Sequence, residues 1–179
     1  MIIDKEKIIF IHIPKTAGTS IRSYFKSISR RKKKPRKHAT IKEIEYSFPT
    51  EYKTYKKFTV VRNPYDRILS WFFYLKTKKN SHVQNMEFKE WLNYLVEIKK
   101  NKIFSTKHIT SIIMLSQSFW INNTVEIIKF ENLNEELNKL FNKQINLPII
   151  NKSNHKYYLE YYNKESLNIV YDIYKEDFK

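Results

Sequence analysis

At 179 residues the chain has the length of one domain, and its 41% apolar and 16% aromatic residues are enough to bury a core, which excludes a disordered protein. The net charge of +16 favours an anionic partner: nucleic acid, anionic lipid, acidic polysaccharide or a phosphorylated cofactor. The lack of cysteine excludes disulfides and cysteine-bound metals, and no apolar run approaches the roughly 18 residues of a membrane span, so we expect a single cytoplasmic domain over residues 1–179 with no signal peptide.

Three short apolar runs predict buried strands, at residues 8–13, 58–61 and 125–130. Their nearly continuous apolar character is typical of parallel strands that are covered on both faces. Apolar residues at helical spacing lie between and after these runs, and they predict five helices plus another between residues 106 and 117. The five stripes begin at Ile21, Ile68, Phe88, Leu133 and Leu167. Strands that alternate with helices predict an α/β domain with a mostly parallel sheet.

Residues 30–37, RRKKKPRK, form a nearly continuous cationic run. Because like charges repel each other, we expect a mobile, exposed loop. The run is either a solvated surface segment or a docking strip for an anionic substrate.

The segment IHIPKTAGTSI, residues 11–21, lies where the first predicted strand turns into the first predicted helix. Unpaired N–H groups at a helix start bind anions, and ligands of open α/β sheets lie at the carboxyl ends of strands. Lys15 adds a cation, and three hydroxyls are available to cap the helix or bind phosphate, those of Thr16, Thr19 and Ser20. Gly18, the only glycine of the chain, permits either a positive φ or a close approach of the backbone to a ligand. We therefore predict an anion site rather than an ordinary capped turn.

The segment is not a Walker A loop, because that motif has an earlier glycine and places its lysine after the last glycine. Here Lys15 precedes Gly18, which disfavours a nucleotide hydrolase.

The segment FTVVRNPYDRILSW, residues 58–71, repeats the passage from strand to helix. Asn63 is a good N-cap and Pro64 suits the first helical turn. Arg62 is expected at the carboxyl end of the strand, and Ser70 two turns into the helix, where a guanidinium and a hydroxyl could bind one phosphate. The alternative for Arg62 is an ordinary salt bridge.

Together, IHIPKTAGTSI and VVRNPYDRILSW resemble the signature pair of sulfotransferases that use 3′-phosphoadenosine 5′-phosphosulfate (PAPS), in order and in spacing. The similarity is greatest to the carbohydrate O-sulfotransferase group that includes heparan-sulfate 2-O-sulfotransferase. It continues weakly through Gln117, residues 129–133, residues 151–153 and the tyrosine-rich C-terminus. The resemblance implies a P-loop-NTPase-like three-layer fold with helices on both faces of the sheet.

The resemblance also implies residue roles. Lys15 would contact the phosphosulfate and its bridging oxygen, and Arg62 and Ser70 would bind the 3′-phosphate. The 5′-phosphate would be bound by the loop Thr16, Ala17, Gly18, Thr19 and Ser20. No metal is expected.

In the family, a histidine between the two motifs often serves as the general base, and this position falls to His38. A base must be neutral, and the neighbouring cations Arg36 and Lys37 disfavour protonation of the imidazole. A predicted capping box, from Thr40 to Glu43, adds the positive end of a helix. The competing histidines are His12, expected to be packed or next to the cofactor, and His82, His108 and His155, for which a surface or capping role is expected.

The resemblance implies a hydroxyl acceptor on a carbohydrate, and the cationic run would favour an anionic glycan. The oligomeric state is left open. Three alternatives remain: a P-loop phosphotransferase or kinase, a nucleic-acid-binding module that uses the basic run, and a degenerate sulfotransferase that binds PAPS without turnover.

Overall fold

The computed structural model describes residues 1–26, 33–79, 81–101, 109–150 and 155–179. Its contacts divide the chain into two compact units, Met1–Arg62 with Gln117–Lys152, and Asn63–Ser116 with Ser153–Lys179. Each unit is assembled from two separate segments of sequence. The expectation of a single domain over residues 1–179 stays a prediction.

The first unit is built on a four-stranded sheet with the order β1-β2-β3-β4. Strand β2 pairs in parallel with β3, and β3 with β4, while the short β1 is antiparallel to β2. The strands are β1 (Ile2–Ile3), β2 (Ile8–Ile11), β3 (Lys56–Val61) and β4 (Glu126–Lys129). The three predicted strands and their parallel pairing are confirmed, and β1 is an addition. The burial predicted for the third strand is wrong, because Ile128 is the one buried residue of β4.

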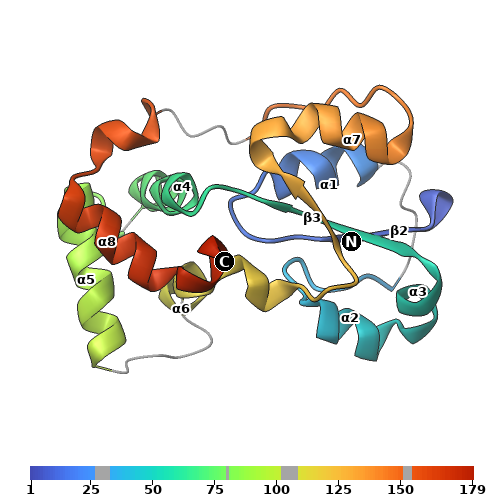
Figure 1. The fold of residues 1–179 in the computed structure, drawn as a ribbon, viewed down its shortest axis with the longest axis horizontal. Helices are drawn as coiled ribbons and strands as arrows, with labels where there is room; N and C mark the ends of the chain where they lie inside the picture. The colour runs from blue at the N-terminus through green and yellow to red at the C-terminus, as the bar shows by residue number, and fades with distance from the viewer. Residues whose placement is uncertain (27–32, 80, 102–108, 151–154) are drawn as a thin grey trace. The chain divides into compact units, whose positions relative to one another are not determined.

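Helices cover both faces of this sheet, with α1 and α7 on one side and α2 and α3 on the other (Figure 1). These helices are α1 (Gly18–Lys26), α2 (Ile41–Ser47), α3 (Pro49–Thr54) and α7 (Leu133–Phe141). Short 3₁₀ turns complete the unit, at Asp4–Glu6, Gln117–Trp120 and Phe130–Asn132. The α/β architecture with a mostly parallel, helix-flanked sheet is therefore confirmed.

The core of the first unit lies between the sheet and α1 and α7. Ile21 and Phe25 are fully buried on one stripe of α1 and pack with Leu137 of α7. Phe10 and Phe58 stand opposite each other on β2 and β3, with ring centroids 5.0 Å apart. All four residues of β2 are buried, as expected for a strand with helices on both faces. This packing fixes the carboxyl ends of β2 and β3 at one edge of the sheet.

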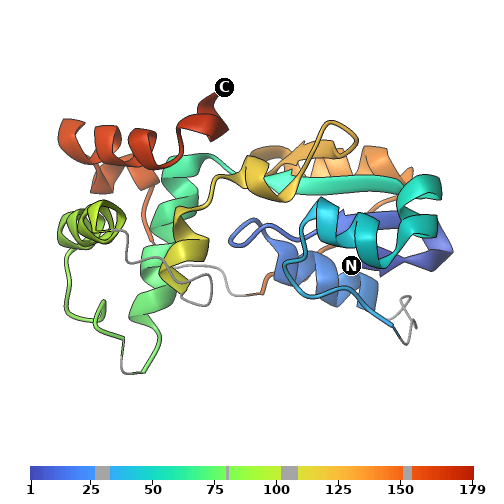
Figure 2. The ribbon, with the colours of Figure 1, turned by 90° about the horizontal axis from the view of Figure 1, so that it is seen from below.

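The second unit is helical and is coloured green, yellow and red in Figure 2. Its helices are α4 (Pro64–Lys76), α5 (Phe88–Lys100), α6 (Ile109–Met114) and α8 (Lys164–Ile173), with 3₁₀ turns at Tyr158–Tyr161 and Lys175–Phe178. As predicted, the Asn63 side chain caps α4 by accepting a hydrogen bond from the Tyr65 N–H at 3.0 Å, and Pro64 occupies the first turn.

A fully buried arginine anchors α4 within this unit. Arg67 donates to the Leu115 carbonyl at 3.1 Å, lies 3.8 Å from an Asp177 carboxylate oxygen and stacks on the Tyr174 ring. Burial lowers the pKa of Arg67. A buried cation persists when it is paired and hydrogen-bonded, as here, so Arg67 is a structural residue.

Candidate functional site

The loop between β2 and α1 is tightly wound. Lys15 and Ala17 both have positive φ, of 70° and 60°, a conformation that costs energy for residues other than glycine. Left-handed residues in a turn direct successive backbone N–H groups to one side, which is how anion-binding concavities form. The loop leads directly into the first turn of α1, whose N–H groups also lack helical partners. Both features suit a phosphate-like group.

Of the two reasons considered for Gly18, the positive φ is wrong, since the left-handed residues are Lys15 and Ala17, and the close approach to a ligand stays a prediction. Gly18 is needed for another reason. A Cβ atom built on it would lie 1.9 Å from Cδ2 and 2.0 Å from Nε2 of His12. The imidazole of His12, 4% exposed, therefore occupies the space that any larger residue would need. The close approach at Gly18 is therefore between its backbone and the His12 side chain of the same protein.

Arg62 follows the last residue of β3, as predicted, and is held on three sides. The Gln117 side chain accepts from the Arg62 N–H and donates to the Arg62 carbonyl, both at 2.9 Å. The guanidinium donates to the Lys15 carbonyl at 3.2 Å and lies over the Phe130 ring at 4.4 Å. The salt bridge considered as the alternative for Arg62 is not tested by these contacts and stays a prediction. The two sequence motifs thus meet through Arg62 and Lys15.

The hydroxyl groups predicted to bind phosphate have different surroundings. Thr16 is fully buried and donates its hydroxyl to the Ile13 carbonyl at 2.9 Å, so it holds the turn together. Ser20 accepts from the Ile150 N–H at 3.3 Å. Thr19 is partly exposed on α1. Ser70 lies buried in α4, in the second unit.

His38 is oriented by its hydrogen bonds. Its Nδ1 lies 2.8 Å from the His12 carbonyl oxygen, and its own carbonyl accepts from Trp120 Nε1 at 3.3 Å. A carbonyl oxygen can only accept, so Nδ1 carries the hydrogen in this bond and Nε2 of the neutral ring keeps its lone pair. This tautomer is the one that a general base needs.

The charge state of His38 also suits a base. Burial lowers its pKa, and the positive charges of Lys37, Arg22 and Arg36 lower it further, against the opposing effect of the hydrogen bond to His12. The ring is therefore neutral at pH 7. The cationic neighbours Arg36 and Lys37 have the effect that was expected from the sequence.

The other histidines lie in different environments. His12 is packed, as expected, with its ring centroid 4.3 Å from that of His38, and burial lowers its pKa to about 2. His82 is exposed and touches Tyr94. His155 lies 3.8 Å from Asp66 within the second unit. His108 lies outside the described residues.

The described part of the cationic run, residues 33–37, is largely exposed. Arg36 pairs with Glu43 at 2.7 Å, and the predicted capping box is present, with Glu43 and Thr40 bonding to each other's backbone. Residues 30–32 lie outside the described part, and the mobility predicted for the run stays a prediction.

Sequence reasoning gave no role to Gln117, Phe130 or Arg22. Gln117 and Phe130 position Arg62 from 55 and 68 residues away, and no local spacing signals such contacts. The available hint was the weak continuation of the family resemblance through Gln117 and residues 129–133. Arg22 is half-buried on α1, beside an apolar stripe that occupies the neighbouring positions.

The buried His12 predicts a pH-dependent stability. Its folded pKa of about 2 lies below the ordinary 6.5, so the unfolded chain binds the proton first as the pH falls. His12 therefore leaves the free energy of unfolding unchanged above pH 6.5 and lowers it below that pH, by about 1.4 kcal/mol per pH unit. Urea unfolding between about pH 7 and pH 4.5 should show this slope.

The matched variant for this experiment is His12→Gln, which removes the titrating ring. As the pH falls, the free energy of unfolding of the variant should decrease less steeply than that of the wild type. The two slopes should differ by about 1.4 kcal/mol per pH unit, whatever the stability of the variant at pH 7. Equal slopes in both proteins would show that His12 can be protonated in the fold.

A mostly parallel α/β sheet flanked by helices, with a glycine-containing loop and a fixed arginine at adjacent strand ends, is the architecture of the P-loop-like class. The model of the sulfotransferase family matches residues 1–179, so the chain belongs to the sulfotransferase family and is a sulfuryl-transferring enzyme. Comparison with curated proteins and with solved structures found no match. Among the described helices, none is long and apolar enough to cross a membrane.

Proposed function

We propose that the protein transfers the sulfuryl group of PAPS to a hydroxyl of a carbohydrate acceptor. The observation that carries this proposal is the contact between the two motifs: the Arg62 guanidinium donates to the Lys15 carbonyl, so a fixed cation lies against the loop that opens α1. An anionic donor with phosphates at both ends of its ribose needs two such groups side by side.

The residues of the first unit fit this donor. The left-handed turns at Lys15 and Ala17 and the start of α1 offer backbone N–H groups, and Lys15 adds a cation. We assign the 5′-phosphosulfate to the loop from Lys15 to Ser20 and the 3′-phosphate to Arg62, while the role of Ser70 at the 3′-phosphate rests on the sequence resemblance alone. Within the described residues, no cluster of histidine and acidic side chains could hold a metal ion.

PAPS supplies an activated sulfuryl group: the acceptor oxygen bonds to sulfur while the bond from sulfur to the bridging phosphate oxygen breaks. Lys15 stabilises the negative charge that gathers on that bridging oxygen. His38 takes the proton of the acceptor hydroxyl at Nε2, and the His12 carbonyl stabilises the resulting imidazolium through Nδ1–H. Catalysis thus rests on positioning and charge, as in phosphoryl transfer.

Binding of adenosine 3′,5′-bisphosphate, the desulfated product, tests the donor site. Lys15→Ala and Arg62→Ala should each weaken its affinity by about 10- to 100-fold, because each removes a charged hydrogen-bond donor to a phosphate. Isothermal titration calorimetry on the whole chain measures this directly.

The control is Lys53→Ala, which removes an exposed cation of α3 in the same unit and should leave the affinity unchanged. Stabilisation of the fold by ATP but not by the bisphosphate would instead favour a phosphotransferase. Equal binding of a DNA oligomer by all variants would favour a nucleic-acid-binding protein.

A further inference from the structure

The His12 ring touches both the loop that opens α1 and the candidate base. A Cβ atom on Gly18 would lie 2.0 Å from Nε2 of His12, and the His12 ring centroid lies 4.3 Å from that of His38. The ring also stacks on Phe10, with centroids 5.8 Å apart and 21° between the planes. Protein interiors are close-packed, so a buried ring with neighbours on several sides resists displacement.

Packing, rather than hydrogen bonding, is what the His12 ring contributes. Its Nδ1 is buried and has no hydrogen-bond partner in the part of the chain that the structure describes. An unpaired polar atom in a core costs free energy, so the ring is not placed here for a polar contact at Nδ1. Imidazole is the smallest aromatic side chain, and Gly18 leaves room for it only because glycine has no Cβ atom. These observations indicate a steric role.

His38 is held twice by this one residue. Its Nδ1 donates to the His12 carbonyl at 2.8 Å, which fixes one edge of the imidazole through the backbone. The His12 ring packs against the His38 ring with 51° between the planes. A ring held by one hydrogen bond can still swing about it, so the packing contact restricts where Nε2, the basic nitrogen, points.

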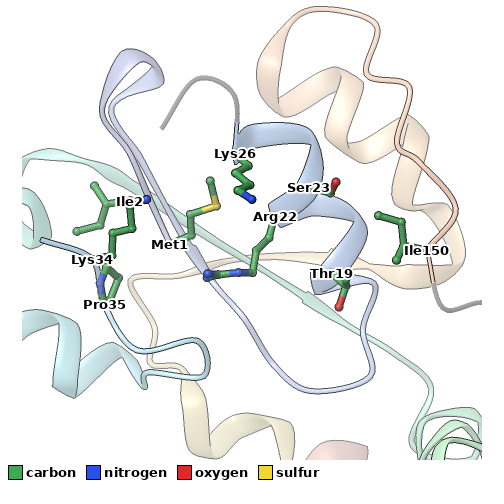
Figure 3. Close-up of a pocket in the computed structure, with 9 residues that line it drawn as sticks. All are labelled: Met1, Ile2, Thr19, Arg22, Ser23, Lys26, Lys34, Pro35 and Ile150. Carbon is green, nitrogen blue, oxygen red and sulfur yellow. The ribbon is translucent and has the colours of Figure 1, made fainter. Parts of the chain in front are cut away.

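The His12 ring also stays neutral while His38 gains and loses a proton. Burial and then the nearby positive charges lower the pKa of His12 to about 2. Figure 3 shows the Arg22 side chain, which reaches from α1 toward Lys34 in the pocket beside this helix. The cationic side chains that act on the pair are Arg22, Lys37 and, for His38 alone, Arg36. A neutral neighbour adds no repulsion to the imidazolium that His38 forms when it takes a proton.

We propose that His12 is a positioning residue, whose ring sets the distance between the Gly18 loop and His38 and so directs Nε2 of His38 toward the acceptor hydroxyl. This inference rests on the proposed function, but the effect of His12 on His38 can also be measured without turnover. In-line transfer requires the reacting atoms to be about 3–3.5 Å apart, and a misplacement of about 1 Å can cost about 100-fold in rate.

Nuclear magnetic resonance of the whole chain, labelled with ¹⁵N at histidine, follows His38 directly, and the signal missing from His38→Ala identifies it. His12→Ala keeps the carbonyl that accepts from Nδ1 but removes the ring. Water then reaches His38, and its pKa should rise toward the ordinary 6.5. His12→Phe keeps a flat ring without a nitrogen, so the pKa of His38 should stay lowered. The control Phe25→Leu alters the core of the same unit and should leave this pKa unchanged.

Transfer kinetics give the second measurement. His12→Ala should lower kcat by about 10- to 100-fold, because the base is no longer held in place. Its affinity for adenosine 3′,5′-bisphosphate should change by less than about threefold, because the donor is assigned to the loop, Lys15 and Arg62. His12→Phe should be at least about tenfold faster than His12→Ala. Thermal melting shows whether each variant is folded, and His12→Gln, which fills more of the space, replaces an unfolded His12→Ala.

The proposal is overturned if His12→Ala leaves both kcat and the titration of His38 at their wild-type values. It is also overturned if bisphosphate affinity falls as much as kcat, since His12 would then be a ligand of the donor. If His12→Phe is as slow as His12→Ala, a ring nitrogen is needed and the steric role is wrong. If the wild type binds no bisphosphate while His38 titrates as expected in the variants, the role of His12 stands and the proposed donor fails.

Discussion

Replacing Gly18 with alanine is expected to lower the free energy of unfolding by about 3 kcal/mol or more, the upper range for overpacking a core. The added methyl would lie 1.9 Å from the His12 ring, which is buried, stacked on Phe10 and tilted against His38. The ring cannot move aside without disturbing the strand end and the candidate base. Chemical denaturation of the purified variant measures the loss.

A double-mutant cycle identifies the cause. His12→Ala removes the ring, so Gly18→Ala should cost little in that background, and the coupling between the two sites should be of the same size as the original loss. A loss from Gly18→Ala that is equal in both backgrounds would mean that the glycine serves something other than His12. Weakened bisphosphate binding by a folded Gly18→Ala protein would then point to a ligand.

Replacing His38 with alanine is expected to reduce sulfuryl transfer by about 10²- to 10⁴-fold, the usual contribution of a general base. Affinity for adenosine 3′,5′-bisphosphate should be unchanged, because the imidazole makes its hydrogen bond to the chain's own His12 carbonyl. Transfer of radiolabelled sulfate from PAPS to a panel of sugars measures the first quantity, and calorimetry measures the second.

The matched control is His82→Ala, which removes an exposed histidine of the second unit and should leave transfer unchanged. The pH profile gives a second check. Because the pKa of His38 is lowered from 6.5, kcat/KM should fall only at pH values below 6.5 as the base is protonated. Sulfuryl transfer by His38→Ala at the wild-type rate would show that a group other than His38 is the general base.

Most helices and strands could be predicted from the sequence because the patterns that specify them are local. Continuous apolar runs predicted β2, β3 and β4, and the turn residues Thr40, Asn63 and Pro64 marked the starts of α2 and α4. Strand β1 has two residues, and α3 has no buried residue, so neither produces a periodic pattern. The predicted first strand was also two residues too long, since β2 ends at Ile11.

Part of the candidate site could be predicted from the sequence for the same reason. Arg62 could be placed at a strand end from its neighbours alone. The purpose of Gly18 could not, because it depends on where the His12 side chain points after the strand has ended. The hydrogen bonds between Gln117 and Arg62 likewise join residues 55 positions apart, and they form only once the fold has brought the end of β3 and Gln117 together.

Arg62 carries a further consequence for binding. A free arginine side chain has about 2 kcal/mol of rotamer entropy to lose when it engages a ligand. Here Gln117 holds the peptide groups on either side of the Cα atom, and the Phe130 ring and the Lys15 carbonyl hold the guanidinium before any ligand arrives. An anion that reaches this strand end therefore meets a preorganised cation, and more of the interaction energy is left for affinity.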